Sequence, residues 1–213
     1  MLTSELLDPA MNDSPFLSLL MIAAGVYVTR LWIQDMKAAD AGEVIMGGLP
    51  GATRSARKPI VIAVVGALVL LLAETAGEIA LGLDQEQSEM TVLFGIYTLS
   101  AAIIEEILFR GYLVIERRGK LLLWAGIVGA SMLFAAFHPF LWEWDDGEWT
   151  WTFNAKGWFS TTAIFLGSLW FYYVRFMPSN PSRSLVPCFA AHFTKNLGVF
   201  GIKGLQGFIT GLW

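Results

Sequence analysis

Residues 59–83, with the sequence PIVIAVVGALVLLLAETAGEIALGL, decide the fold class of this chain of 213 residues. Glu74 and Glu78 are the only charged side chains in that stretch. A helix needs about 20 consecutive, mostly apolar residues to cross the hydrocarbon core of a bilayer, so the stretch predicts a membrane-spanning helix. Further stretches of similar length and character predict five more spans: residues 15–34, 91–113, 120–142, 158–177 and 184–203.

The composition of the whole chain agrees with a protein whose surface faces lipid. Hydrophobic residues make up 55% of the chain, charged residues only 15%, and the mean hydropathy is +0.58. Soluble domains carry about 25% charged residues, which argues strongly against a soluble enzyme. We therefore expect one integral membrane domain over residues 1–213: an all-α, polytopic transmembrane helical bundle of about six spans, with the lipid bilayer as a partner.

The net charge of −4, without a basic tail or stripe, argues against nucleic acid as a partner. The single cysteine, Cys188, cannot form a disulfide within the chain, and its apolar surroundings predict a buried, inert side chain.

The basic residues between the predicted spans indicate the orientation of the chain. The positive-inside rule counts Lys and Arg in short loops, and here they gather in every second loop. The basic residues that share one side are Lys37, Arg54, Arg57, Lys58, Arg117, Arg118, Lys120, Arg175 and Arg183. The rule places this side in the cytoplasm and predicts that both termini lie outside.

Tryptophans cluster around the loop after residue 142: Trp142, Trp144, Trp149, Trp151 and Trp158. Indoles favour the membrane interface, so we expect these residues to act as anchors. A rim that guides the substrate is the alternative.

Ionisable residues in the predicted third span are the first candidates for function, because charges in lipid are costly and usually mark a site. The sequence AAIIEEILFRGY places Glu105, Glu106 and Arg110 in an otherwise apolar helix. Glu106 and Arg110 are four residues apart and can pair along a helix. Glu105 lies about 100° around the helix axis from Glu106 and is left without that partner.

Both histidines of the chain also lie in predicted spans. Phe134 and His138 are four residues apart, and Pro139 predicts that the helix ends or kinks at this point. His192 and Asn196 have the same spacing, so an imidazole and a carboxamide share one helix face. A single membrane histidine can equally form a structural hydrogen bond between helices, so one histidine alone would not indicate a function. Three such polar sites in one chain favour a function.

The three motifs, Glu-Glu-x-x-x-Arg, Phe-x-x-x-His and His-x-x-x-Asn, occur in this order on three hydrophobic helices and resemble those of the CPBP family. This family comprises CAAX proteases and bacteriocin-processing (Abi) proteins, which are glutamic-type intramembrane endopeptidases. The resemblance implies a catalytic core over about residues 91–203, preceded by a two-helix extension over about residues 15–83. It also implies a membrane-anchored peptide or protein as substrate and a prokaryotic inner membrane as location.

The same resemblance implies a division of roles. Glu105 is expected to be the general base that activates a water molecule, and His138 to hold or polarise that water. His192 and Asn196 are expected to donate hydrogen bonds to the tetrahedral oxyanion. Three residues are expected to support the site: Glu106, Arg110 and Phe134.

A zinc site built from the same residues is an alternative, since two histidines and a glutamate can bind zinc and activate water. We favour a metal-free site without a cofactor, because the chain lacks the compact His-Glu-x-x-His spacing of zincins. Two other classes of function stay open: a small proton-coupled transporter, and a non-catalytic partner such as an immunity or scaffolding protein. The lack of a repeated half argues against the transporter, and the complete motif set argues against an inactive protein.

Other charges within the predicted spans have a structural interpretation. Lys195 is expected to form a buried ion pair with Glu74 or Glu78 from the second span, with a role in lining a substrate cavity as the alternative. The motif residues are predicted to lie at different depths in the membrane, which conflicts with a shared site. Along straight helices, Glu105 and His192 would lie about 12 Å from the inner ends of their spans but His138 roughly 27 Å, so a tilt and a break at Pro139 must close the gap.

Overall fold

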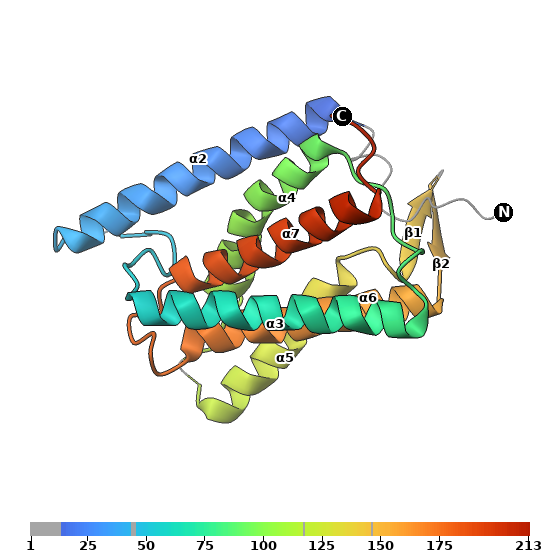
Figure 1. The fold of residues 1–213 in the computed structure, drawn as a ribbon. Coiled ribbons are helices and arrows are strands. Elements are labelled where there is room, and N and C mark those ends of the chain that lie inside the picture. The colour runs from blue at the N-terminus through green and yellow to red at the C-terminus, as the bar shows by residue number, and fades with distance from the viewer. Residues whose placement is uncertain (1–13, 44–45, 117, 146) are drawn as a thin grey trace.

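The computed structural model describes residues 14–43, 46–116, 118–145 and 147–213, which form a bundle of long helices with a short hairpin at one end (Figure 1). The helices are α2 (Pro15–Asp40), α3 (Arg57–Leu81), α4 (Val92–Glu105), the π-helix η1 (Glu106–Tyr112), α5 (Lys120–Ala136), α6 (Ala155–Phe176) and α7 (Val186–Gln206). The hairpin strands are β1 (Trp142–Asp145) and β2 (Glu148–Trp151). The predicted all-α helical bundle is confirmed.

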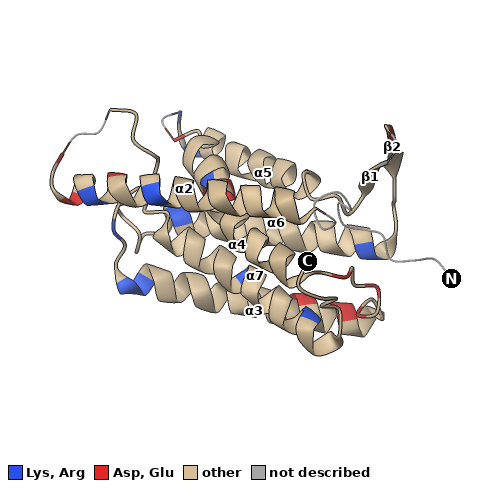
Figure 2. Ribbon diagram, turned by 90° about the horizontal axis from the view of Figure 1, so that it is seen from above, with Lys and Arg blue, Asp and Glu red and all other residues tan. Residues whose placement is uncertain are grey.

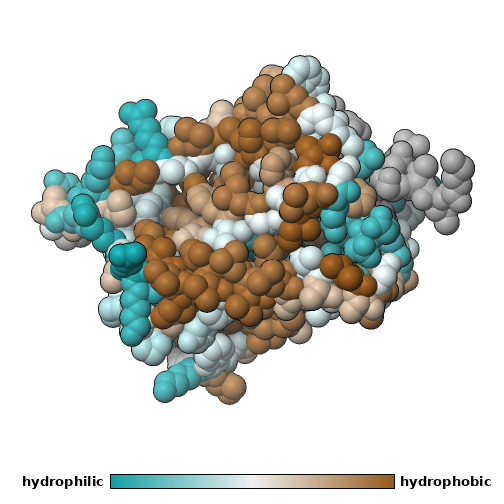
Figure 3. All heavy atoms as spheres, in the orientation of Figure 1, coloured by the Kyte–Doolittle hydropathy of each residue, from teal (hydrophilic) through white to brown (hydrophobic). Residues whose placement is uncertain are grey.

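Each predicted span coincides with a helix, although the helices differ in length and polarity. Among the described residues, three helical stretches are long and apolar enough to cross a membrane: Pro15–Asp40, Arg57–Leu81 and Val92–Tyr112. Helix α5 is apolar but has 17 residues. Helices α6 and α7 are long enough but carry buried polar side chains such as Ser168 and His192. Figure 3 shows a broad hydrophobic band between more hydrophilic ends, as expected for a bundle whose middle lies in lipid.

The predicted fourth span was too long at its C-terminal end. Helix α5 ends at Ala136, and the Phe137 N–H caps it by bonding to the Leu133 carbonyl at 3.0 Å. Pro139 cannot continue the helical hydrogen bonds, so the chain turns there and enters β1 at Trp142. The prediction that the helix ends near Pro139 is therefore confirmed, whereas the expected extent of the fourth span to residue 142 is wrong, and His138 lies after the helix.

Helix α7 occupies a central place in the bundle. It packs against α3, α4, α6 and η1, while α2 packs on α4 and α5 packs on α6. The contact between α3 and α7 is close at Gly198, where a Cβ atom would lie 2.1 Å from Leu71 Cδ2. Small residues permit such approaches between membrane helices. The central helix therefore carries motif residues that neighbours on several sides can hold in place.

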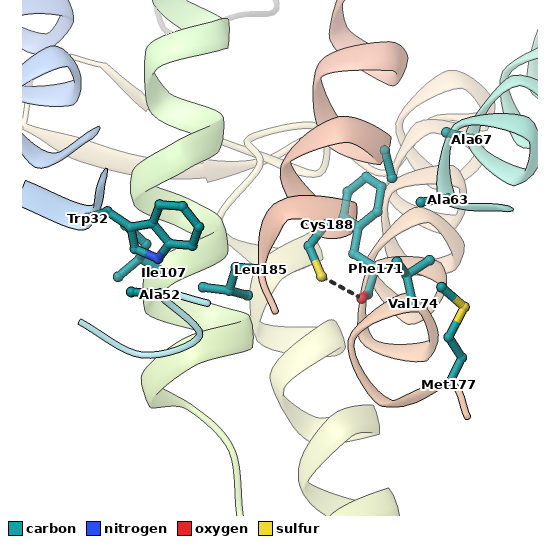
Figure 4. Packing of buried hydrophobic residues seen from close by; sticks show 11 residues of the cluster. Trp32, Ala52, Ala63, Ala67, Ile107, Phe171, Val174, Met177, Leu185 and Cys188 are labelled. Carbon is teal, nitrogen blue, oxygen red and sulfur yellow. Dashed lines mark hydrogen bonds between the residues drawn. The ribbon is translucent and has the colours of Figure 1, made fainter. Parts of the chain in front are cut away.

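The main hydrophobic core joins both halves of the chain. Figure 4 shows its members from α2, α3, η1, α6, α7 and the loops before α3 and α7: Trp32, Ala52, Ala63, Ala67, Ile107, Phe171, Val174, Met177, Leu185, Cys188 and Ala191. The Cys188 side chain is fully buried, and its thiol donates to the Phe171 carbonyl at 3.4 Å. The predicted burial of this cysteine is confirmed.

Charged residues gather at the ends of the bundle. Figure 2 shows Lys and Arg concentrated where α2 ends and α3 begins, while Asp and Glu occur at both ends. Arg117, one of the basic residues predicted to lie on the cytoplasmic side, lies outside the described residues. That the basic end faces the cytoplasm stays a prediction.

Candidate active site

Two adjacent glutamates lie where α4 changes into the π-helix η1. Glu105 is the last residue of α4, and Glu106 is the first residue of η1. Single π-helical turns within α-helices are rare and frequently occur at functional sites. The fully buried Tyr172 of α6 donates its hydroxyl hydrogen to the Phe109 carbonyl at 2.6 Å, so a neighbouring helix satisfies the backbone of the irregular turn. The π-helix gives the two carboxylates different surroundings.

Glu106 and Arg110 form a fully buried ion pair. Arg110 Nη1 lies 3.1 Å from Glu106 Oε1, and neither side chain is exposed. Arg110 Nη2 donates to Ser168 Oγ at 2.6 Å, and Ser168 Oγ donates to Ser131 Oγ at 3.0 Å. The guanidinium carbon lies 4.4 Å from the centroid of the Phe134 ring. Buried charges persist only with such partners, so α5 and α6 complete the setting of this pair.

His192 of α7 lies beside both glutamates. Its Nδ1 is 2.8 Å from Glu106 Oε1, and its Nε2 is 3.7 Å from Glu105 Oε2. A carboxylate accepts hydrogen bonds, so the short contact assigns a hydrogen to Nδ1. The Phe171 ring stacks on the imidazole with a centroid distance of 4.8 Å. The nitrogen that remains available for chemistry, Nε2, is therefore the one nearer to Glu105.

The side chains of the two glutamates differ sharply in solvent exposure. The Glu105 side chain is 31% exposed, while that of Glu106 is fully buried. Glu106 is neutralised by Arg110, whereas the nearest cationic candidate for Glu105 among its described contacts is the His192 ring. Glu105 is thus the more accessible of the two carboxylates.

His138 lies beside this cluster in the turn after α5. Its Nδ1 is 2.8 Å from the Phe134 carbonyl, which can only accept, so Nδ1 carries a hydrogen and Nε2 has the lone pair of the neutral ring. The Phe134 ring lies 4.8 Å from the His138 ring and 6.2 Å from the His192 ring. Phe134 therefore contacts both histidine rings.

Asn196 lies one turn further along α7 and has a different partner. Its amide nitrogen donates to the Thr98 carbonyl of α4 at 3.0 Å. Thr98 lies about two turns before Glu105 on the same helix. The structure thus gathers Glu105, Glu106, Arg110, Phe134, His138 and His192 into one cluster, while Asn196 lies at its edge.

Four residues that support this cluster were not predicted from the sequence: Ser131, Ser168, Phe171 and Tyr172. Serine and aromatic residues are common in membrane helices, and no spacing in the chain connects these residues with Arg110. Their roles become visible only in the packed structure. Glu105, His138 and His192 are the residues nearest to what a metal site would require, but in the described part of the chain no three His, Cys, Asp or Glu side chains are arranged to hold a metal ion.

Comparison with known protein families assigns the chain to a family. Residues 87–198 match the family described as type II CAAX prenyl endopeptidase Rce1-like. The chain belongs to the Rce1-like family. The matched region contains every motif residue from Glu105 to Asn196, and the resemblance predicted from the motifs is confirmed. No curated protein and no solved structure matches the chain.

Membership in the Rce1-like family identifies the general activity of the protein. The protein is an intramembrane endopeptidase of the CAAX protease type and therefore a hydrolase. Its long apolar helices agree with an integral membrane protein, and its family implies a membrane-associated protein as substrate.

Proposed function

We propose that this Rce1-like protein hydrolyses a peptide bond in a metal-free, glutamic-type site in which Glu105 is the general base. The observation that carries the proposal is the contrast between the two adjacent glutamates. Glu105 is 31% exposed and lies near His192 Nε2, while Glu106 is fully buried and paired with Arg110. Carboxylates whose surroundings differ in this way can divide their tasks, one reactive and one structural.

In the proposed reaction, Glu105 accepts a proton from a water molecule as the water oxygen attacks the carbonyl carbon of the substrate. His138 Nε2, whose lone pair is free when Nδ1 donates to the Phe134 carbonyl, accepts the second hydrogen of that water in a hydrogen bond. The carbonyl oxygen becomes an oxyanion in the tetrahedral intermediate. The C–N bond then breaks, and Glu105 returns its proton to the leaving nitrogen.

His192 and Asn196 are proposed to stabilise the oxyanion. Because His192 Nδ1 already points to Glu106, donation from Nε2 to the oxyanion requires a hydrogen on both ring nitrogens. Asn196 has two amide hydrogens, and the bond to the Thr98 carbonyl uses one of them. The second hydrogen is proposed to bind the oxyanion.

The family description also suggests the substrate. We propose a membrane-anchored peptide or protein with a lipid-modified end, with a prenylated Cys-a-a-X terminus as the first class to examine. We further propose that α2 and α3 form an N-terminal extension on the catalytic core, and that the enzyme acts in a prokaryotic inner membrane with both termini outside.

The experiment is cleavage of a prenylated Cys-a-a-X peptide by protein reconstituted in lipid vesicles. Glu105→Gln is expected to reduce the rate by about 10²- to 10⁴-fold, the usual contribution of a general base. Asn196→Ala is expected to lose about 10²- to 10³-fold, as for one oxyanion donor. Glu116→Gln is the matched control, because this exposed carboxylate pairs with Arg183 outside the cluster, and it should retain the wild-type rate.

Wild-type activity in folded Glu105→Gln protein would overturn the assignment of the base. Inactivation by a strong chelator, reversed by added zinc, would instead support the metal-dependent alternative. A non-prenylated membrane peptide of the same sequence shows whether the lipid contributes to recognition.

A further inference from the structure

The hairpin between α5 and α6 has a regular arrangement of tryptophans. Strands β1 and β2 are antiparallel, with Trp142 opposite Trp151 and Trp144 opposite Trp149. Gly147 in the turn has a φ of 83°, a conformation that glycine adopts without strain in tight hairpin turns. The turn and the register therefore place two Trp–Trp pairs next to each other.

All four indoles lie on one face of the hairpin, because side chains alternate along a strand and the paired positions share a face. The rings of Trp142 and Trp149 stack at 4.5 Å between centroids, and Trp144 and Trp151 contact Trp149 edge-on. The Glu143–Thr150 pair lies on the opposite face. The hairpin is thus amphipathic, with an indole face and a polar face.

The indole face is largely uncovered. Trp144 and Trp151 are each 60% exposed, and Trp149 is 48% exposed. Contiguous exposed apolar surface of this kind marks an interaction site. Indole combines an apolar ring system with one N–H donor, so its favoured environment is the boundary between membrane and water.

Contacts at the base of the hairpin connect the indole face to the helices. Trp142 Nε1 donates to the Ala136 carbonyl at the end of α5 with a length of 2.7 Å. On the other strand, Trp151 stacks on Phe153, which stacks on the exposed Trp158 in the first turn of α6. The aromatic row is therefore continuous with the outer surface of the bundle.

The position of the hairpin agrees with a location at the membrane surface. Figures 1 and 2 both show β1 and β2 at one end of the bundle, running across the long helices rather than along them. An element with this direction lies roughly in the membrane plane when the helices cross the bilayer.

We propose that the hairpin rests in the lipid headgroup region, with the indole face toward the bilayer and the polar face toward water. Lipid is the occupant that the contacts favour, because the aromatic row leads without a break onto the outer surface of α6. Only residues 139–141 separate His138 from Trp142, so this anchor also fixes the segment that carries His138 at the membrane surface.

The test compares neighbouring positions on opposite faces. A nitroxide label is attached to Trp149→Cys or to Thr150→Cys in a Cys188→Ala background, and the full-length protein is reconstituted in phosphatidylcholine and phosphatidylglycerol vesicles. The label at 149 is expected to collide several-fold more often with oxygen than with a water-soluble nickel relaxant, and the label at 150 should show the reverse preference. Trp144→Cys and Glu143→Cys repeat the comparison on β1, in case one variant does not fold.

Equal access of the nickel relaxant to both faces would overturn the proposal. So would a label at 149 that is open to water in vesicles and becomes protected only when a substrate peptide is added, because the indole face would then belong to the substrate. The measurement requires no catalytic turnover, so its outcome is independent of the proposed mechanism.

Discussion

Arg110 is the residue on which the buried part of the site depends. Its guanidinium contacts Glu106 and Ser168, and it also lies over the rings of Phe134, Phe171 and Tyr172 at 4.4, 5.1 and 5.0 Å. A planar guanidinium can bond at its edge and stack on its faces at the same time, whereas an ammonium group acts as a point charge. The surroundings therefore select arginine rather than positive charge alone.

We predict that Arg110→Met lowers the free energy of unfolding by about 3–5 kcal/mol, because Glu106 would keep a buried charge without its partner. Arg110→Lys should lose less stability but should also lose activity, since one ammonium cannot contact both Glu106 and Ser168 as the guanidinium does. Denaturant unfolding in mixed micelles and peptide cleavage measure the two effects. Arg118→Lys, at an exposed position, is the control, and wild-type behaviour of Arg110→Lys would contradict the argument.

At this scale, the sequence predicts contacts along a helix better than contacts between helices. The Glu106–Arg110 pair followed from its four-residue spacing and is confirmed. The approach of His192 to both glutamates could be expected only from the family resemblance, because it depends on the rotation of α7 against α4. For Ser168, no spacing along the chain indicates its contact with Arg110.

Among the elements, the π-helix η1 accepts a hydrogen bond from a neighbouring helix. The Tyr172 hydroxyl is buried and reaches the Phe109 carbonyl within η1. Nothing in the motif spacing predicts a π-helix, because a motif residue at i+4 fits an α-helix equally well. We therefore expect the contact with α6 to stabilise this part of the backbone.

We predict that Tyr172→Phe destabilises the protein by about 1–3 kcal/mol, the usual cost of leaving a buried polar group without its partner. Activity should fall with it, because η1 positions Glu106 and Arg110. Tyr173→Phe is the matched control, since Tyr173 is its exposed neighbour on the same helix. Equal stability of the two variants would show that the hydroxyl does not hold the π-helix.

The hairpin and the end of α5 show where hydropathy alone misleads. Residues 137–142 are apolar enough to extend a predicted span, yet Pro139 ends the helix and the alternating tryptophans form strands. The early end of α5 does little to remove the conflict in depth, because the 17 residues from Lys120 to Ala136 already extend for about 25 Å before His138. Figure 1 shows α4 and α5 oblique to α3, so depths counted along parallel helices do not apply.

In the whole molecule, a helix outside the family match packs against a helix that carries motif residues. Helix α3 precedes the matched residues 87–198, yet it packs along α7 and contributes Leu71 to the close contact at Gly198. Lys195 of α7 forms an ion pair with Glu74 of α3, and the two side chains are 10% and 18% exposed. The ion pair expected from the sequence is thus confirmed, and Glu78 instead pairs with Lys156. The choice between the two glutamates depends on helix rotation, which the sequence leaves open.

Lys195 lies between His192 and Asn196 on α7, so we propose that its pair with Glu74 also fixes the rotation of the motif-bearing helix. We predict that Lys195→Met or Glu74→Leu alone lowers the free energy of unfolding by about 3–5 kcal/mol, because each change leaves one charge buried without a partner. The double variant should recover most of the stability, since replacing both members of a buried pair by apolar residues is often neutral. If the pair positions α7, activity should likewise be low in each single variant and recover in the double variant.

A double-mutant cycle in mixed micelles separates this coupling from the loss of packing. The exposed Glu116–Arg183 pair provides the control cycle, and its coupling should stay below about 1 kcal/mol. Additive effects of Lys195→Met and Glu74→Leu would mean that the two charges do not stabilise each other. Recovery of stability in the double variant without recovery of activity would mean that the pair holds the bundle together but does not position His192 and Asn196.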